Sequence, residues 1–190
     1  MGPPFRSLIP ETAADDSALQ QLKMNAADLE SELEKLHPAS FSWALGCCGW
    51  IREDAEDVLQ TSYLKILEGR ARFEGRAAFK TFLFGVIRRT ASEHRRRRFL
   101  SGRMLLGLAP DRTAPDPDPE ESAARSQQTA RLRAALRGLA GRQSQVLQLV
   151  FGHELTVEEA GAVLGVSTGS ARVHYDRGKK RLLRILGGVS

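Results

Sequence analysis

The sequence predicts an all-α protein with two small helical domains. Apolar residues recur at intervals of three and four over most of the chain, and no run alternates with period two for long enough to form a strand. Residues 108–128 hold four prolines and five acidic residues, and proline at alternate positions excludes a helix interior. We therefore expect an N-terminal extension and helix start at 1–30, a first domain at 31–107, a flexible acidic Pro-rich linker at 108–128 and a second domain at 129–190.

The composition indicates a folded protein. Of the 190 residues, 42% are hydrophobic and 27% are charged, so the chain can bury a core. No stretch approaches the roughly 18 apolar residues of a membrane span, and the first residues lack the apolar core of a secretory signal. The two cysteines, Cys47 and Cys48, are neighbours and cannot form a disulfide framework. We therefore expect structural thiols in a cytoplasmic protein.

Two helices are predicted at the start of the first domain. An apolar stripe with 3-4-3-4-3 spacing indicates an amphipathic helix over Leu19–Leu36. This helix is expected either to pack on its own domain or to contact a partner. Packing on its own domain is favoured, because the stripe barely reaches the length of a coiled-coil seam. Pro38 suits the first position of a helix, where its missing N–H costs nothing, so a second helix is expected from Pro38 to near Gly49. Its inward residues would be Phe41, Ala44, Leu45 and Cys48.

A third and a fourth helix complete the first domain. The third is expected to begin around Asp54, where acidic residues in the first turn suit the helix dipole, and to end at Gly69. A loop at 70–78 leads into a fourth helix from about Phe79 to Arg98. Its apolar face would consist of Phe79, Phe82, Leu83, Val86 and Ile87.

The second domain contains a predicted helix-turn-helix. Thr156 and Glu159 have the spacing of a capping box that opens a short helix, and Gly165 ends that helix. Ser167 then caps a long final helix, and Gly161 lets the two helices approach closely. Two preceding helices are marked by Leu132, Leu136 and Leu139 and by Val146, Leu147, Val150 and Phe151.

The sequence offers no pattern typical of an enzyme. The four histidines are scattered, and none has metal-ligand spacing with either cysteine. The glycine-rich loops that bind nucleotides and the nucleophile turn of hydrolases are missing from the sequence. We therefore expect a binding protein with no catalytic residue, no metal and no cofactor.

Positive charge is concentrated in two blocks. Residues 61–109 carry 12 basic and 3 acidic side chains, and residues 131–190 carry 10 and 4. Two basic blocks around an acidic spacer indicate two contacts with one polyanion. A solvated tail is the alternative for the first block, but its arginines extend an apolar-faced helix. In the final helix, Arg172 can read a guanine edge in the major groove, whereas Lys179 and Lys180 suit phosphates.

The third helix carries charge of the opposite sign. Asp54, Glu56 and Asp57 are expected to cluster with Gln60 on its exposed side. A well-capped solvated face is one interpretation, and a protein partner that offers arginines is the other. Its sign excludes DNA as a ligand of this surface.

Several stretches of the chain resemble the extracytoplasmic-function (ECF) group of bacterial sigma factors in the sigma-70 family. Residues 54–60 (DAEDVLQ) resemble the core of region two, and residues 73–83 (FEGRAAFKTFL) look like the loop and helix that follow it. Residues 155–161 (LTVEEAG) and 169–182 are similar to region four. The order of the motifs, the linker and the chain length also match that family.

The resemblance implies an alternative sigma factor, which binds core RNA polymerase and directs it to promoters through −10 and −35 elements. The third helix would dock on the clamp helices of the largest polymerase subunit through Asp54, Asp57 and Gln60, and the loop after it would capture a flipped base. An anti-sigma factor is a further candidate partner. The implied −10 residues are Phe73, Arg76, Lys80, Arg88, Arg89, Ser92 and Arg95. The implied −35 residues are Ser170, Arg172, His174, Arg177, Lys179 and Lys180.

The chain departs from the family pattern at three places. Phe82 stands where a tryptophan is usual, which keeps the bulk but loses an indole donor. Arg89 stands where asparagine is common, so the base read at that position is open. Ser170 and Ala171 replace a usual Thr-Val pair and give a smaller core contact.

Two other classes of protein compete with this interpretation. Residues 139–182 also resemble the output helix-turn-helix of LuxR-type regulators, which would bind DNA as dimers without polymerase. The block at 54–98 is foreign to those regulators and argues against them. A sigma mimic that binds an anti-sigma factor without touching promoter DNA is the second alternative. The two arginine-rich helices argue against it.

Overall fold

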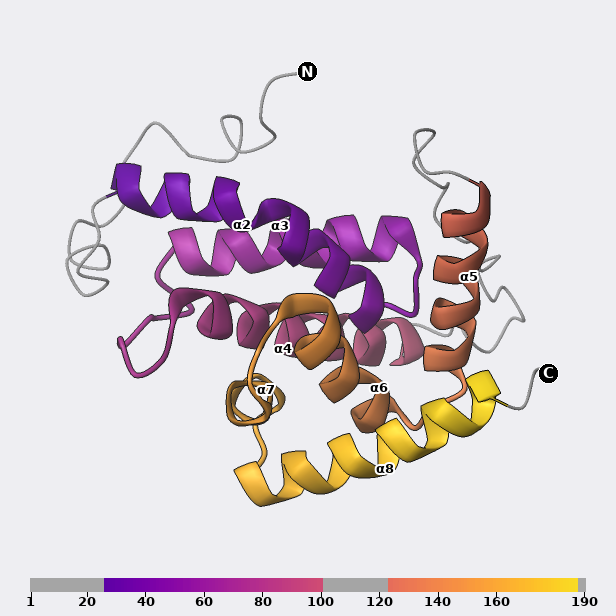
Figure 1. Ribbon diagram of the computed structural model, residues 1–190. Coiled ribbons are helices and arrows are strands. Elements are labelled where there is room, and N and C mark those ends of the chain that lie inside the picture. The colour runs from indigo at the N-terminus through magenta and orange to yellow at the C-terminus, as the bar shows by residue number, and fades with distance from the viewer. Residues whose placement is uncertain (1–25, 101–122, 188–190) are drawn as a thin grey trace. The chain divides into compact units, whose positions relative to one another are not determined.

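The computed structural model describes residues 26–100 and 123–187, and every regular element within these ranges is a helix (Figure 1). The all-α prediction is therefore confirmed. Apart from residues 49–51, which are grouped with the second unit, the chain divides into two compact units between Ala109 and Pro110, and each unit is described by itself. Within the described ranges, no helix is both long enough and apolar enough to cross a membrane.

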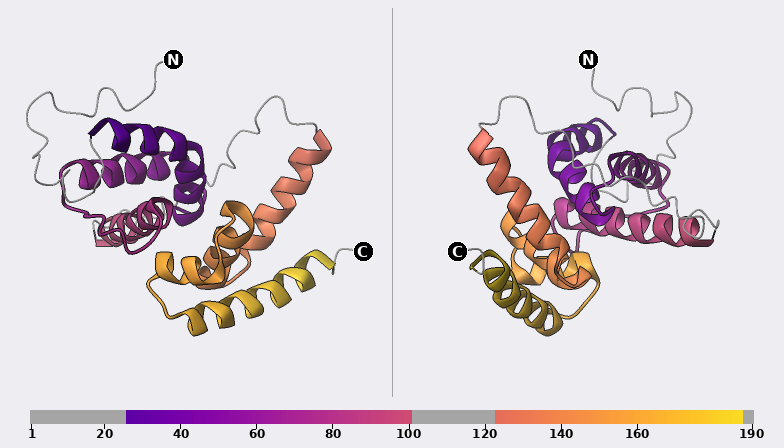
Figure 2. Two further views of the ribbon diagram at one scale, coloured as in Figure 1. Left: turned by 60° about the vertical axis from the view of Figure 1, so that its left-hand side comes forward. Right: turned by 90° about the vertical axis from the view of Figure 1, so that its right-hand side faces the viewer.

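The first unit packs three helices, α2 (Ala26–Cys47), α3 (Arg52–Leu67) and α4 (Phe79–Leu100), each against the other two (Figure 2). Its core centres on Trp43, which is fully buried beside Phe84. The Trp43 Nε1 donates a hydrogen bond to the Phe84 carbonyl oxygen at 3.0 Å, and the two rings stack with centroids 6.0 Å apart. This contact ties the first half of α4 to α2.

The expected helix break at Pro38 is wrong, because α2 runs through this proline. A proline inside a helix removes one hydrogen bond and costs about 3 kcal/mol. Buried residues on both sides, such as Leu33 before it and Trp43 after it, belong to the same core and outweigh that cost. The helix bends along its length (Figure 1), as proline-containing helices do. Residues 19–25 of the predicted stripe lie outside the described residues.

The predicted third and fourth helices are confirmed as α3 and α4, with small shifts at their ends. Helix α3 begins at Arg52, two residues before the expected Asp54, and α4 begins at the expected Phe79. Helix α4 is more deeply buried than its predicted stripe. Of the expected apolar face, Leu83, Val86 and Ile87 are buried, whereas Phe79 and Phe82 are half-buried. The helix also buries Thr81, Phe84, Gly85, Thr90 and Ala91.

The neighbouring cysteines lie at the end of α2, and both are buried free thiols. Burial raises the pKa of the Cys48 thiol to about 12 and raises the pKa of Cys47 as well. A thiol reacts as the thiolate, so burial makes both side chains inert at neutral pH. Their environment is that of structural thiols.

The second unit begins earlier than the sequence predicts. Its first helix, α5 (Ala123–Arg137), occupies the last six residues of the expected linker. The last proline of that segment is Pro119, and the alanines, arginine and glutamines that follow are compatible with a helix. The linker prediction is therefore wrong from residue 123 onward, and its earlier part lies outside the described residues.

The remaining elements of the second unit are α6 (Gly141–Leu147), a π-helical turn η1 (Gln148–Gly152), α7 (Val157–Leu164) and α8 (Thr168–Gly187). The π-helical turn is absent from the sequence prediction. A π-helix adds a residue to the turn and changes which side chains face inward. Phe151, one of the apolar residues that marked the predicted helix, lies in this turn and is 61% exposed.

The helix-turn-helix is confirmed in its local detail. The Thr156 hydroxyl accepts from the Glu159 N–H, and the Glu159 carboxylate accepts from the Thr156 N–H, which completes the capping box. Gly165 has φ +60°, the left-handed conformation that favours glycine at a helix end. The Ser167 hydroxyl accepts from the Ser170 N–H at 3.2 Å. A Cβ at Gly161 would lie 3.3 Å from that of Ala171, so the two helices meet there.

Candidate nucleic-acid and polymerase interfaces

Five of the six arginines of α4 fall into two groups. Two of them are tied to the interior of the first unit: Arg95 donates to the Cys47 carbonyl at the end of α2, at 3.2 Å, and Arg98 pairs with Asp54 on α3. Three others, Arg89, Arg96 and Arg97, are exposed, and Arg95 is exposed as well despite its bond to α2. Arg95 was predicted as a −10 residue, and the structure gives it this additional role at the end of α2.

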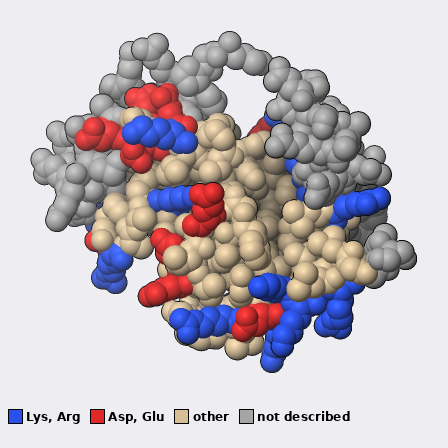
Figure 3. Space-filling view, in the orientation of Figure 1, with Lys and Arg blue, Asp and Glu red and all other residues tan. Residues whose placement is uncertain are grey.

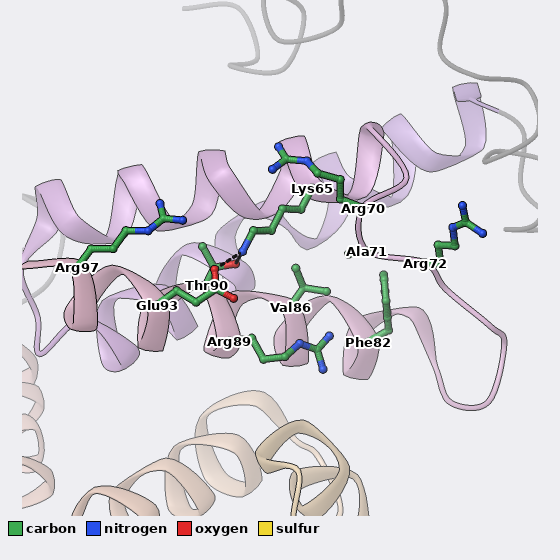
Figure 4. A pocket seen from close by; sticks show the side chains of 10 residues that line it. All are labelled: Lys65, Arg70, Ala71, Arg72, Phe82, Val86, Arg89, Thr90, Glu93 and Arg97. Atoms are coloured by element: carbon green, nitrogen blue, oxygen red, sulfur yellow. Dashed lines mark hydrogen bonds and ion pairs between the residues drawn. The ribbon is translucent and has the colours of Figure 1, made fainter.

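A pocket of about 530 Å³ lies between the end of α3, the loop after it and α4 (Figure 4). We call it the α3–α4 pocket. Phe82, Val86 and Ala71 give it an apolar lining, and five cationic side chains surround a single carboxylate. Aromatic surface beside a basic groove is the arrangement that binds single-stranded nucleic acid, through base stacking and phosphate contacts. The pocket is lined by Lys65, Arg70, Ala71, Arg72, Phe82, Val86, Arg89, Thr90, Glu93 and Arg97.

A polar bridge crosses the α3–α4 pocket. The Lys65 ammonium reaches from α3 to the Glu93 carboxylate at 2.7 Å and to the Thr90 hydroxyl at 3.1 Å (Figure 4). The hydrogen bond from Lys65 holds the pKa of Glu93 below its ordinary value, and nearby arginines add to this effect. The bridge therefore fixes α3 against α4 while the carboxylate stays ionised.

Of the charged residues of this pocket, only Arg89 was among the predicted −10 residues, although Arg97 belongs to the basic run for which phosphate contact was expected. On α4, Phe82, Arg89, Glu93 and Arg97 follow one another at intervals of seven, four and four, which places them on one helix face. That spacing was available in the sequence. Arg70 and Arg72 carry no such pattern, because their position depends on how the loop folds back.

The loop between α3 and α4 is closed at its base by aromatic rings. Phe73 lies edge-on to Phe79, with centroids 5.5 Å apart, and 5.3 Å from the ring of Phe82. The predicted −10 residue Phe73 is therefore half-buried in an aromatic cluster. Arg76, near the middle of the loop, is exposed and pairs with Glu74 at 2.9 Å.

The other predicted −10 residues lie along α4. The Lys80 ammonium is 5.8 Å from the centre of the Phe84 ring. Arg88 is half-buried, and the exposed Ser92 hydroxyl donates to the Arg88 carbonyl oxygen at 3.0 Å. These side chains share α4 with the pocket but do not line it.

The acidic face of α3 is smaller than predicted. Asp57 and Gln60 are exposed as expected, and the exposed Glu56 pairs with Arg52 at 2.9 Å. The expected exposure of Asp54 is wrong: its side chain is only 17% exposed, and its carboxylate contacts α4. The reason is helix periodicity, because Asp54 lies one turn before the buried Val58 on the side of α3 that faces α4.

Helix α8 presents most of its predicted residues to solvent. Ala171 and Gly178 face the core, and His174 is half-buried. A Cβ at Gly178 would lie 3.1 Å from Leu147 and 3.2 Å from the Gln143 backbone, so α8 packs closely on α6. Lys and Arg side chains gather along the outer side of α8 (Figure 3). The exposed predicted residues are Ser170, Arg172, Arg177, Lys179 and Lys180.

Comparison with known proteins defines the class to which this architecture belongs. Residues 33–99 match sigma-70 region 2, and residues 135–183 match sigma-70 region 4. The chain is 33% identical over 138 residues to the RNA polymerase sigma factor CarQ of Myxococcus xanthus, which covers 70% of this chain and 75% of CarQ. It is 26% identical over 158 residues to the ECF RNA polymerase sigma factor SigD of Mycobacterium tuberculosis, with coverage of 81% and 74%.

The fold has a solved counterpart. The sigma factor RpoE of Bartonella quintana, crystallised in complex with the anti-sigma factor NepR, superposes with a TM-score of 0.71 at 22% identity, over 86% of this chain and 99% of that one. The first unit is thus a sigma region 2 and the second a sigma region 4. The chain belongs to the ECF group of the sigma-70 family.

Proposed function

We propose that this chain is an alternative sigma factor that binds core RNA polymerase with α3 and promoter DNA with α4 and α8. Members of this family are transcription initiation factors and not enzymes, and the proposed site of action is the cytoplasm. The observation that carries the proposal is the distribution of charge. One chain combines an acidic face on α3 with basic faces on α4 and α8, in the units that match regions 2 and 4.

Core polymerase is assigned to the acidic face of α3. Asp57 and Gln60 are exposed on the outer side of this helix. Anionic side chains repel phosphate, so this face suits a protein surface that offers arginines. The clamp helices of the largest polymerase subunit are the proposed partner.

The melted strand of the −10 element is assigned to α4 and the α3–α4 pocket. Exposed arginines such as Arg89 and Arg97 can contact the backbone, and Phe82 lines the place where a base would enter. The loop at 70–78 lies beside the pocket and contributes Arg70 and Arg72 to it. A base that leaves the stack would therefore meet an apolar wall with cations around it.

The −35 element is assigned to α8. The N-terminal residues of a recognition helix enter the major groove, which places Arg172 where it can contact a base edge. Lys179 and Lys180 lie two turns later and are exposed, as phosphate contacts would be. An anti-sigma factor is included among the proposed partners because the solved RpoE was crystallised with one.

In vitro transcription tests this proposal. Core RNA polymerase supplemented with the chain is expected to initiate from specific sites in a genomic promoter library, whereas core alone is not. Asp57→Lys places like charge against the expected arginines, so the variant should lose co-purification with core. Circular dichroism should show intact helices, because Asp57 is exposed and lies in the second turn of α3, beyond the first turn in which an acidic residue stabilises the helix dipole.

Two outcomes would contradict the proposal. Promoter-specific binding of the chain to duplex DNA without polymerase would favour a LuxR-type regulator. A folded Asp57→Lys variant that binds core and initiates normally would remove α3 from the polymerase contact.

A further inference from the structure

Asp54 occupies an unusual position for a residue of the acidic helix face. It lies in the first turn of α3, but its carboxylate contacts two residues of α4 that are four apart. The Asp54 Oδ1 lies 3.3 Å from the His94 Nε2, and the Asp54 Oδ2 accepts a hydrogen bond from the Arg98 guanidinium. All three side chains are less than one-third exposed.

We propose that Asp54 is a positioning residue, which sets the arginine-rich end of α4 for the −10 strand and does not bind polymerase. The inference rests on the proposed function. Both carboxylate oxygens of Asp54 are already engaged inside the first unit. A polymerase arginine would therefore have to displace Arg98, whereas Asp57 on the same helix is exposed.

The end of α4 needs such a tie. Residues 95–98 are four consecutive arginines at the end of a helix, and their mutual repulsion disfavours an ordered arrangement. Asp54 supplies a negative charge from α3, and it holds two successive turns of α4 because His94 and Arg98 lie on one face. The hydrogen bond from Arg95 to the Cys47 carbonyl fixes the same stretch to α2.

These ties determine which arginines can face a nucleic acid. With about 100° of rotation per residue, His94, Arg95 and Arg98 fall within roughly 100° of one another around the helix. Arg96 and Arg97 centre on the opposite side, together with Arg89 about two turns earlier. Arg97 and Arg89 both line the α3–α4 pocket. The ties from His94, Arg95 and Arg98 to α2 and α3, together with the Lys65 bridge on the pocket side, therefore set Arg89 and Arg97 at the pocket.

The proposal makes an unusual prediction about charge. Asp54→Asn removes a negative charge near DNA, so the non-specific affinity for DNA should stay the same or rise. The slope of log binding constant against log salt concentration should become steeper by up to about 0.7, because the released Arg98 can contact a phosphate. Selectivity for the −10 sequence should fall, because the arginines at the end of α4 are no longer held in a fixed orientation toward the α3–α4 pocket. Substitution of a residue that merely maintained the fold would lower non-specific and sequence-specific binding together.

The test uses holoenzyme assembled from core polymerase and the full chain. Wild type, Asp54→Asn and the control Glu53→Gln are compared for core affinity and for binding of a labelled single-stranded −10 oligonucleotide against a permuted one. Glu53 is an exposed carboxylate one position earlier and supplies the matched loss of charge. Asp54→Asn should bind core within about twofold of wild type and lose about tenfold in selectivity, the equivalent of one charge-assisted hydrogen bond. Glu53→Gln should retain that selectivity.

The partner variant keeps the proposal falsifiable if Asp54→Asn fails to fold. Arg98→Gln should show the same loss of selectivity with normal core affinity, and adding Asp54→Asn to it should change selectivity no further. Intact selectivity in Arg98→Gln, or additive losses in the double variant, would overturn the proposal. So would a folded Asp54→Asn that binds core weakly and keeps its selectivity. If wild type itself fails to initiate, the proposed function fails instead.

Discussion

Helices α4 and α8 are both rich in arginine and lysine, but they use these residues differently. Helix α4 is buried along much of its length, and Arg95 and Arg98 bond to α2 and α3. Helix α8 buries Ala171 and Gly178, and no ion pair between described residues involves one of its cations. Part of the charge of α4 therefore helps to build the fold, whereas the cations of α8 are available for binding. Substitutions of Arg95 and Arg98 should change stability together with recognition, and substitutions of the α8 cations should change recognition alone.

The largest expected effect tests how far α4 depends on its core. Trp43→Ala removes the ring stacked on Phe84 and the hydrogen bond to its carbonyl oxygen. We expect a loss of about 3–5 kcal/mol in the stability of the first unit. Hydrogen exchange measured peptide by peptide should show lost protection in α4 and unchanged protection in α8. Equal losses in both helices would mean that the two units do not unfold separately.

The next effect concerns recognition by α8 alone. Arg172→Ala should cost roughly 1–3 kcal/mol at one base pair of the −35 element, because a bidentate contact to guanine is lost. Lys180→Ala should instead weaken all sequences alike and reduce the salt slope by about one unit. Competition of holoenzyme binding among −35 variants measures both. If Arg172→Ala weakened binding equally for every −35 sequence, Arg172 would be a phosphate contact. Thermal unfolding of both protein variants should match that of the wild type.

A pair of glycines compares the packing of the two helices. Gly178→Ala should destabilise the second unit by about 1–3 kcal/mol, because the new methyl group would lie 3.1 Å from Leu147 and 3.2 Å from backbone. Gly85→Ala in α4 should stabilise the first unit by about 0.5–1 kcal/mol, because the nearest atom is the Arg89 Nη1 at 4.0 Å. Denaturant unfolding measures both values. A stabilising Gly178→Ala would contradict the close approach of α6 and α8.

The smallest expected effect is the pH dependence of the bridge across the α3–α4 pocket. Lys65 lowers the pKa of Glu93, so the bridge stabilises the folded state above the ordinary pKa of the carboxyl and loses that contribution as the pH falls through the lowered value. The Glu93 side chain is 42% exposed, which limits the contribution to less than about 1 kcal/mol. In urea unfolding, Glu93→Gln should reduce the fall in the free energy of unfolding at acidic pH, whereas Glu53→Gln should leave that pH dependence unchanged.

Sequence reasoning succeeded where structure is encoded by neighbouring residues. The capping box of Thr156 and Glu159, the glycine at 165 and the Ser167 cap each act over three or four positions, so the helix-turn-helix could be predicted in detail. Sequence reasoning failed where tertiary packing determines the course of a helix. Pro38 breaks a helix by local rules, but a shared core on both sides carries α2 through it.

The candidate sites divide in the same way. Exposure of Asp57 and of the α8 cations follows from helix periodicity, which a sequence contains. The engagement of Asp54 with α4 required the pairing of helices 40 residues apart. The α3–α4 pocket depended on the path of a loop, so Arg70 and Arg72 could not be assigned from their neighbours.

The aromatic cluster at the base of the loop has a consequence for how this protein can change. Phe73 and Phe79 meet across the loop, and residues 74–78 are exposed beyond them. Alterations confined to those five positions leave the three-helix core in place. Under the proposed assignment of this loop to the −10 element, we therefore expect promoter preference to diverge, by natural drift or by engineering, through exchange of this short exposed segment while the scaffold beneath it stays the same.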